Sequence, residues 1–507
     1  MAPYNYERLS AQDASFLAFE SANTHMHVAA TQVFETGRLA TGDGGVDFDA
    51  YRRATEAVLH RIPRYRQRLQ WIPLESHPVW VDDPDFNIEY HLRHASLPRP
   101  GTEEQLKRLS ARIMGQPLDR SKPLWEIWVV EGLEGGRFAV ISKIHHCMVD
   151  GSSGVDLAQI LMSLTPDFEI EEAPRYIPRP LPSGSRLLVD EWARRATIPL
   201  RVLRGLRAFR RETEDLAGEL KIRTRALTGL FGMYRSASES PVNGDIGPHR
   251  RFDWLEMPLE DVKAVRRKLG CSLNDVVLAT VTGAVRSFMQ ERQVDPASLE
   301  FRVSAPVSVR REGEQGRLGN RVSAWILELP IGEADRLKQL EALHATTQEL
   351  KESRQAVGVD MLMQAANWMP SALLALGARA SSGPINAIVT NVPGPQFPLY
   401  LLGAKLEAMY PQVPLLPNTG LGVALVSYNG RLCWGFNADY ELVPDLVRFV
   451  ALVRESFLDL AKLAGAAPTD DEAASARVRS AEASMAGDAE SLDEPDTEAM
   501  PAPTPLH

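Results

Sequence analysis

The sequence predicts an α/β (α+β) fold divided into two units. Strand-like and helix-like segments alternate from residue 11 to about residue 170, and again from residue 250 to about residue 465. The 507-residue length exceeds what one ordinary hydrophobic core supports, so two or more domains are expected. Hydrophobic residues make up 44% of the chain and charged residues 24%, which places it among folded globular proteins.

The first unit is predicted to span residues 1–171. Apolar residues at helical spacing indicate helices, and apolar runs bounded by turn residues indicate strands. A Glu-Gly-Gly turn at 134–136 separates the last two strands. On this basis we expect helices at 11–19, 51–60 and 106–113, and strands at 26–34, 126–130 and 138–144.

A linker is predicted at residues 172–249. Its first part, residues 172–190, is rich in Pro, Ser and Gly, which interrupt regular structure. Residues 191–235 have a helical pattern, with eleven Arg and Lys residues against five acidic ones. We interpret this basic stretch as a solvated helical linker, and the alternative is an interfacial anchor on anionic lipid.

The second unit is predicted to span residues 250–465. We expect helices at 259–269, 274–290 and 446–463, and strands at 301–309, 321–329, 387–391, 422–428 and 431–438. An acidic tail follows at residues 466–507, without aromatic side chains and rich in Ala, Glu, Asp, Ser and Pro, so we expect it to be disordered. This tail holds ten acidic residues and two arginines, and it accounts for most of the net charge of −10.

Composition excludes several classes of protein. The near-neutral body lacks the basic surface of a nucleic-acid-binding protein. Three scattered cysteines make neither a disulfide framework nor a zinc site, which favours the reducing cytoplasm. The N-terminus has no secretory-signal pattern, and no stretch reaches the roughly 18 apolar residues of a membrane span. Any contact with lipid is therefore expected to be peripheral, at the inner membrane or at lipid inclusions.

The chemistry is predicted to lie in residues 138–151, FAVISKIHHCMVDG. A strand ends at His145 and His146, and Asp150 and Gly151 then turn the chain. Because successive strand residues point to opposite faces, only one histidine can reach a given site unless the strand has already ended. Adjacent histidines alone are more often structural, but the complete HHxxxDG spacing at a strand-to-helix turn is specific. A neutral imidazole accepts a hydroxyl proton near neutral pH, so the segment suits general-base catalysis.

The HHxxxDG pattern resembles the signature of the CoA-dependent acyltransferase superfamily. That superfamily includes chloramphenicol acetyltransferase-like enzymes and the condensation domains of nonribosomal peptide synthetases. Further segments are similar to one branch, the bacterial wax ester synthase/acyl-CoA:diacylglycerol O-acyltransferases. These segments run in order along the chain: LSAQDASFL at 9–17, MHV at 26–28, PLW at 123–125, NDVVLA at 274–279, PVSVR at 306–310, GN at 319–320 and TNVPGP at 390–395. The sequence departs from the branch at His25, where Pro is common, and at Ala29, where Gly is common.

The resemblance implies two chloramphenicol-acetyltransferase-like subdomains, each with a mixed sheet flanked by helices, and a channel between them. It implies that His146 is the general base, that Asp150 is an ion-paired structural carboxylate, and that no metal or redox cofactor is needed. His145 then either supports the base or is a structural neighbour. Gly151 allows the turn or leaves room for substrate. Cys147 offers a thiol nucleophile, but direct transfer needs no acyl-enzyme.

Four further residues are candidates for substrate binding or oxyanion stabilisation. Asn274 lies in a helix that Ser272 is expected to cap, and it either donates toward the developing oxyanion or braces the channel. Thr390 and Asn391 offer similar donors at a strand end. Trp125 either lines an acyl tunnel or packs in the core.

The predicted function is therefore acyl transfer from acyl-CoA to the hydroxyl of diacylglycerol, of a long-chain fatty alcohol, or of both. Because both acceptors present a hydroxyl on an apolar body, the motif does not separate triacylglycerol from wax ester synthesis. One alternative is a condensation-type acyltransferase that uses other acceptors, against which the NDVVLA and TNVPGP segments argue. The other is a catalytically inactive lipid-droplet surface protein, against which the intact His146 and Asp150 argue.

Overall fold

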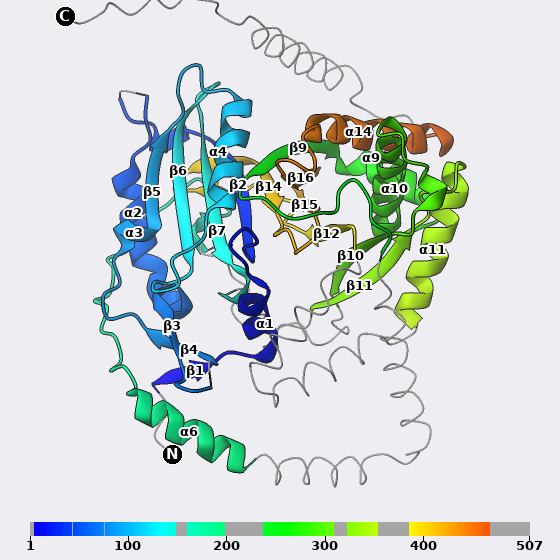
Figure 1. Cartoon of the computed structure of the whole chain (residues 1–507). Coiled ribbons are helices and arrows are strands. Elements are labelled where there is room, and N and C mark those ends of the chain that lie inside the picture. Colours follow the sequence, from blue (N-terminus) through cyan, green and yellow to red (C-terminus); the bar gives the residue numbers. More distant parts are fainter. Residues whose placement is uncertain are drawn as a thin grey trace, which may run out of the picture.

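The strands form three sheets that helices flank (Figure 1). The computed structural model describes residues 5–42, 44–75, 77–148, 160–197, 237–308, 322–352 and 385–466. Within this part of the chain the sheets contain three, seven and six strands. The two larger sheets mix parallel and antiparallel neighbours, which confirms the predicted α/β class with mixed sheets.

The seven-stranded sheet forms the centre of the first unit. Its order is β5 (Leu92–Ser96), β6 (Trp125–Leu133), β7 (Arg137–His145), β2 (His27–Glu35), β14 (Ala404–Gln412), β13 (Tyr400–Leu401) and β8 (Met162–Ser163). Only β5 and β6 run parallel. The helices of this unit are α1 (Ala11–Phe19), α2 (Phe48–Val58), α3 (Ile88–His91) and α4 (Glu103–Gly115), with short 3-10 turns at Gly37–Leu39, Leu59–Arg61 and Pro63–Arg66.

A small antiparallel sheet extends the first unit at its lower end in Figure 1. Its order is β1 (Tyr6–Arg8), β4 (Pro78–Asp82) and β3 (Gln67–Trp71). Helix α6 (Gly184–Ala196) packs on it through Leu187, which shares a small core with Ile72, Val79 and Val81.

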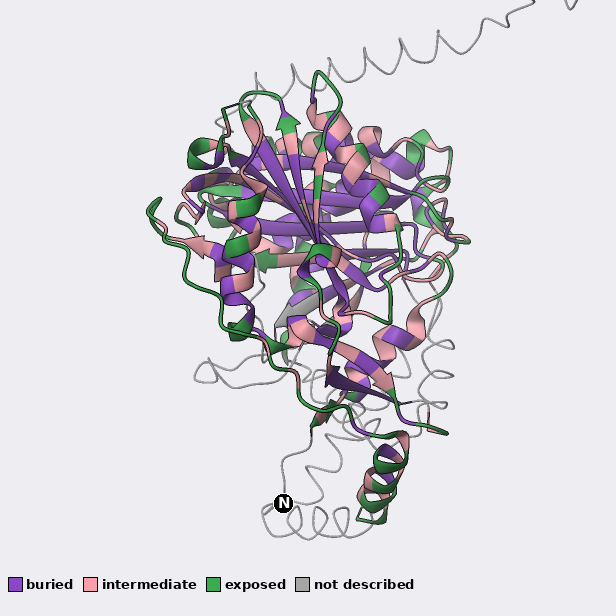
Figure 2. Cartoon of the chain, turned by 90° about the vertical axis from the view of Figure 1, so that its left-hand side faces the viewer, coloured by how far each residue is buried: buried purple, intermediate pink, exposed green. Residues whose placement is uncertain are grey.

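The six-stranded sheet forms the second unit. Its order is β11 (Val322–Leu329), β10 (Phe301–Ser308), β12 (Ala387–Pro393), β15 (Leu421–Tyr428), β16 (Arg431–Asp439) and β9 (Arg250–Pro258). The helices beside it are α9 (Leu259–Leu269), α10 (Leu273–Glu291), α11 (Arg336–Glu352) and α14 (Leu446–Leu463), with one 3-10 turn at Pro296–Ser298. The hydrophobic core lies between this sheet and the helices, and the central strands of both units are buried (Figure 2).

Local signals in the sequence set the helix ends. Helices α1, α9 and α14 have the predicted bounds, and α10 differs by one residue at each end. The Ser272 side chain accepts the Asp275 backbone N–H, and the Asp275 carboxylate accepts the Ser272 N–H, which confirms the predicted cap of α10. Helix α9 ends at Gly270, whose φ of +65° is the left-handed conformation that favours glycine.

Other segments differ from expectation. Residues 172–190 were predicted to interrupt regular structure, but α6 begins at Gly184 because the Ser183 side chain caps it. Eight of the described strands were not predicted: β1, β3, β4, β5, β8, β9, β13 and β14. The basic stretch beyond residue 197 and the acidic tail from residue 467 lie outside the described residues.

Strand β14 connects the two units. It comes from the second half of the chain but pairs with β2 in the first sheet, and its residues alternate between buried and half-buried. Trp254 of β9 stacks on Tyr410 with ring centroids 4.4 Å apart. Gly435 of β16 passes so close to β14 that a Cβ there would lie 1.9 Å from the carbonyl oxygen of Pro411. The two units therefore share a buried core.

The helices of the described ranges include none that is both long enough and apolar enough to cross a bilayer.

Candidate active site

His146 lies where β7 ends. Strand β7 pairs antiparallel with β2, and the last partners in this ladder are His145 and His27. The chain then enters a 3-10 turn, η4 (His146–Met148). The His146 backbone N–H donates to the Met26 carbonyl at 2.7 Å. Because the strand has already ended, His146 is released from the strand alternation that would place it opposite His145.

The His146 imidazole is half-buried and packs against an aromatic ring. Helix α1 packs on η4, and the Phe16 ring stacks on the imidazole with centroids 4.0 Å apart. Burial, with a smaller contribution from the nearby His145, lowers the pKa of His146 to about 4. Its Nδ1 atom is buried and has no hydrogen-bond partner among the described residues. At neutral pH the ring is therefore uncharged and can accept a proton.

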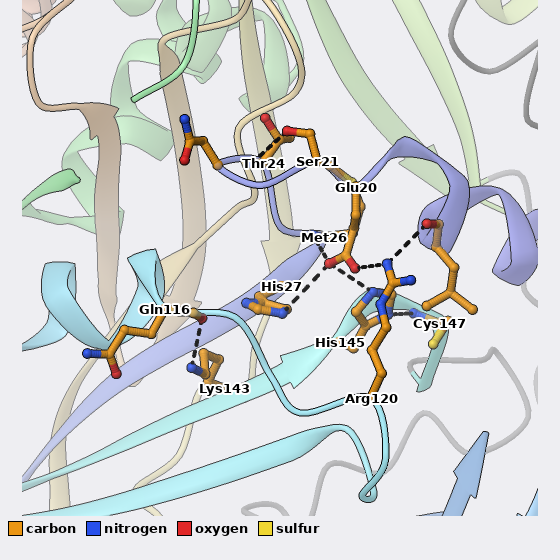
Figure 3. A network of polar contacts seen from close by, with 12 residues as sticks. Glu20, Ser21, Thr24, Met26, His27, Gln116, Arg120, Lys143, His145 and Cys147 are labelled. Carbon is orange, nitrogen blue, oxygen red and sulfur yellow. Dashed lines mark hydrogen bonds and ion pairs between the residues drawn. The ribbon is translucent and has the colours of Figure 1, made fainter. Parts of the chain in front are cut away.

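His145 turns away into a buried polar network (Figure 3). Its Nδ1 accepts the Cys147 backbone N–H at 3.1 Å, so in the neutral ring the proton is on Nε2. The Nε2 atom lies 3.1 Å from Oε1 of Glu20, at an angle too bent for a regular hydrogen bond. His145 thus contacts the turn that carries His146 rather than joining His146 as a second base.

Glu20 is the centre of this network. Its Oε1 accepts the Met26 backbone N–H at 2.8 Å and lies 3.8 Å from Nε2 of His27, and its Oε2 accepts from the Arg120 guanidinium. Burial acts to raise the pKa of this carboxyl, but His145 and Arg120 outweigh burial and hold the pKa well below its usual range. Glu20 is therefore a buried, permanently ionised carboxylate beside the candidate base.

Cys147 has the wrong environment for a nucleophile. Its side chain is buried in the hydrophobic core of the first unit. Burial, followed by the charges of Asp13 and Glu20, raises the pKa of the thiol well above its usual value. The reactive form of cysteine is the thiolate, so this site disfavours an acyl-cysteine intermediate.

Trp125 lies in the core of the first unit. It is fully buried, its indole N–H donates to the Tyr65 carbonyl at 2.8 Å, and its ring stacks on His91 at 4.5 Å. Because the indole N–H already has a partner in the protein, the geometry favours core packing over the lining of an acyl tunnel as the role of Trp125.

The other candidates belong to the second unit. Asn274 is half-buried in the first turn of α10, next to Asp275, whose oxygens lie 2.8 Å from His344 Nδ1 and from Thr347 Oγ1 on α11. Thr390 and Asn391 are half-buried near the end of β12. Within the described ranges these three residues make no hydrogen bond or ring contact with the His146 turn, so their role stays a prediction.

Asp150 and Gly151 lie in residues 149–159, outside the described residues. Their predicted roles are therefore not tested. Among the residues that are described, no cluster of three or more His, Cys, Asp or Glu side chains could hold a metal ion.

Sequence reasoning assigned no role to Glu20, Arg120 or Phe16. Phe16 lies inside the LSAQDASFL segment, so the family pattern did single out its neighbourhood. Glu20 and Arg120 meet only because the loop before β6 folds back over the end of α1, where Arg120 also donates to the Leu17 carbonyl. A contact across 100 positions leaves no local signal.

One solved structure with this fold places the chain among acyltransferase-like proteins. The wax ester synthase/diacylglycerol acyltransferase from Marinobacter aquaeolei VT8 is similar with a TM-score of 0.63 and 26% identity, covering 90% of this chain and 100% of that chain. The first condensation domain of the calcium-dependent antibiotic synthetase is similar with a TM-score of 0.57, covering 92% and 98%. At 17% identity, the second likeness concerns the fold alone.

Two family models then identify the branch. The wax ester synthase/diacylglycerol acyltransferase catalytic domain matches residues 9–277, and the C-terminal domain of the same family matches residues 318–461. A putative diacylglycerol O-acyltransferase of Mycobacterium tuberculosis is 33% identical over 456 residues, 87% of each chain. The probable diacylglycerol O-acyltransferase tgs1 of the same organism is 33% identical over 86% of this chain and 92% of its own. The chain belongs to the wax ester synthase/diacylglycerol acyltransferase family, which confirms the resemblance.

Proposed function

We propose that this O-acyltransferase moves a long-chain fatty acyl group from acyl-CoA to the hydroxyl of diacylglycerol, of a fatty alcohol, or of both, with His146 as the general base. The observation that carries the proposal is the state of His146: a half-buried imidazole at a strand end, kept uncharged by its lowered pKa, whose Nδ1 has no hydrogen-bond partner among the described residues. Such a group can take a proton without first losing one.

The chemistry follows from that state. His146 accepts the hydroxyl proton as the acceptor oxygen attacks the thioester carbonyl, and a C–O bond forms. The tetrahedral intermediate collapses, the C–S bond breaks, and the proton passes from the imidazolium to the leaving thiolate, giving ester and free CoA. A base with a pKa of about 4 is weak in the ground state, but its conjugate acid protonates the thiolate readily. No acyl-enzyme is required, in keeping with the buried Cys147 thiol.

The acceptor is proposed from the relatives. The mycobacterial relatives are named diacylglycerol O-acyltransferases, and the Marinobacter protein is named for both wax ester synthesis and diacylglycerol acylation. Diacylglycerol is therefore our first acceptor and a long-chain alcohol the second. We propose that the reaction needs no metal or redox cofactor, since the thioester supplies the activated acyl group.

We propose a cytoplasmic protein that contacts lipid from the surface, at the inner membrane or at lipid inclusions. Helix α6 supports this: Val189 and Trp192 are 67% and 69% exposed and lie three residues apart, on the same side of the helix. Of its two acidic residues, Glu191 is buried against Arg8 and Arg194, and Asp190 is half-buried and accepts from the Tyr6 hydroxyl. An apolar outer face with an aromatic ring suits shallow insertion between lipid headgroups. Sedimentation of the Trp192→Glu protein with phosphatidylglycerol vesicles tests the contact, and wild-type-like binding contradicts it.

The activity is tested with purified protein, palmitoyl-CoA and either dioleoylglycerol or hexadecanol. CoA release and ester formation are measured for the wild type and for His146→Ala. We expect the wild type to form ester and His146→Ala to lose at least about 100-fold in kcat, the lower range for a positioned general base. Full activity of His146→Ala refutes the base, and an inactive wild type with both acceptors refutes the substrate class.

A further inference from the structure

We infer that Glu20 is the positioning residue of this site: it fixes, from both sides, the turn that presents His146. The inference rests on the proposed role of His146 and concerns a residue outside the HHxxxDG motif. Glu20 is the first residue after α1, and its side chain is only 8% exposed. No step of the reaction requires this buried charge to touch substrate, so its position needs another explanation.

The first of two connections between Glu20 and the His146 turn runs through Met26. Oε1 of Glu20 accepts the Met26 N–H at 2.8 Å, and the Met26 carbonyl accepts the His146 N–H at 2.7 Å. A single residue at the start of β2 is thus held by Glu20 on one side and holds the base residue on the other. A shift of the Glu20 carboxylate is transmitted to the His146 backbone through the main chain of this one residue.

The second connection between Glu20 and the His146 turn runs through His145. The same oxygen lies 3.1 Å from Nε2 of His145, whose Nδ1 accepts the Cys147 N–H at 3.1 Å (Figure 3). An anionic neighbour favours the proton on Nε2, which leaves Nδ1 as the acceptor that Cys147 needs. Without the carboxylate the ring can adopt the other tautomer, and the Cys147 N–H then faces an N–H. The first connection holds the His146 backbone, and the second holds His145 and Cys147. Glu20 therefore restrains both chain neighbours of His146.

Arg120 holds the carboxylate in place. It donates to Oε2 of Glu20 and to the Leu17 carbonyl at 3.2 Å, which ties the anion to the last turn of α1. His27 of β2 lies on the side of the other oxygen, with its Nε2 3.8 Å from Oε1 of Glu20, and burial, followed by the charge of Lys143, lowers the pKa of His27 well below the usual value. Within the described residues the carboxylate therefore meets the Arg120 guanidinium and the rings of His145 and His27.

The test uses Glu20→Met and Glu20→Gln with a matched control, Glu191→Met. Methionine keeps the length of the side chain but removes both acceptors, and glutamine keeps one. Glu191 is also a buried, arginine-paired carboxylate, 3% exposed, but it belongs to α6. We expect Glu20→Met to lower kcat about 10- to 100-fold with little change in KM, the effect of a misplaced catalytic group, and Glu20→Gln to lie between it and the wild type. Glu191→Met is expected to lower Tm and leave kcat unchanged.

A second readout does not depend on activity. The ring nitrogens are observed by NMR in protein labelled with 15N-histidine, and the His145→Asn variant identifies the His145 signals. In the wild type we expect the His145 ring to be protonated on Nε2 alone. In Glu20→Met we expect a mixture of the two tautomers. An unchanged ring, or a kcat loss in Glu20→Met no greater than in Glu191→Met, overturns the inference. If His146→Ala is fully active, the proposed base fails, and the ring signal still decides whether Glu20 controls His145.

Discussion

The ring of Phe16 lies stacked on the imidazole of His146, with centroids 4.0 Å apart and planes inclined by 28°. Phe16 comes from α1, and His146 begins the turn after β7. The contact takes one face of the imidazole out of water, and burial is the largest cause of the lowered pKa of His146. A residue with no acid–base chemistry of its own therefore helps to set the protonation state of the candidate base.

The first prediction concerns pH. The neutral imidazole is the active form, and with a pKa of about 4 it is neutral throughout the range above pH 5. We therefore expect kcat/KM to stay level as pH falls from 8 through the ordinary histidine value of 6.5, and to decline only as it approaches the pKa of about 4. The measurement is kcat/KM with palmitoyl-CoA across this range, and a midpoint near 6.5 would falsify the assignment.

The second prediction concerns Phe16. Replacing it with alanine admits water to the imidazole, so the pKa of His146 should rise toward 6.5 and the acid limb of the rate profile should move up with it. We also expect kcat to fall about 10-fold, because the ring loses its packing partner.

Phe48 supplies the matched control for this variant. It stacks on His94 at 4.7 Å on the first unit, away from the β7 turn. Phe48→Ala should lower Tm and leave the pH profile unchanged. Equal profiles for the two alanine variants would show that Phe16 has no specific effect on the base.

The third prediction concerns Cys147. Direct transfer needs no thiol, and burial keeps this thiol protonated. Cys147→Ala should therefore keep kcat within about threefold of the wild type while losing about 1–2 kcal/mol of stability, the usual effect of trimming a core side chain. Mass spectrometry of the wild type during turnover should find no acyl adduct at this position. An acylated Cys147 peptide would replace the single-displacement mechanism with a covalent one.

The fourth prediction concerns the buried Asp275. Burial acts to raise the pKa of its carboxyl, but His344, the Ser272 backbone and Thr347 outweigh burial and lower it. Asp275→Ala leaves these donors unpaired, so we expect a loss of about 2–4 kcal/mol, seen as a lower apparent Tm. Ser272→Ala, which removes only the helix cap, should lose about 1 kcal/mol. Equal effects of the two changes would show that the contacts to α11 contribute little.

The sequence determined the features that local chemistry controls. Capping by Ser272 and the left-handed Gly270 set the ends of α10 and α9, because those signals act within a few residues. The HHxxxDG spacing singled out His146, and the end of β7 at His145 is where the motif predicted a strand end. The order of the family-like segments along the chain also sufficed to predict the family, since that order does not depend on how the segments meet in the fold.

Only the tertiary structure decided what long-range contacts control. The alternation in β14 is visible in the sequence, but its pairing with β2 is not, because period-2 patterning says that a strand is half-buried and not which sheet it joins. Likewise, Glu20 and Arg120 carry no local pattern. Their charges have a function only after α1 and the loop before β6 come together and exclude water, since burial is what turns an ordinary ion pair into a fixed support for the His146 turn.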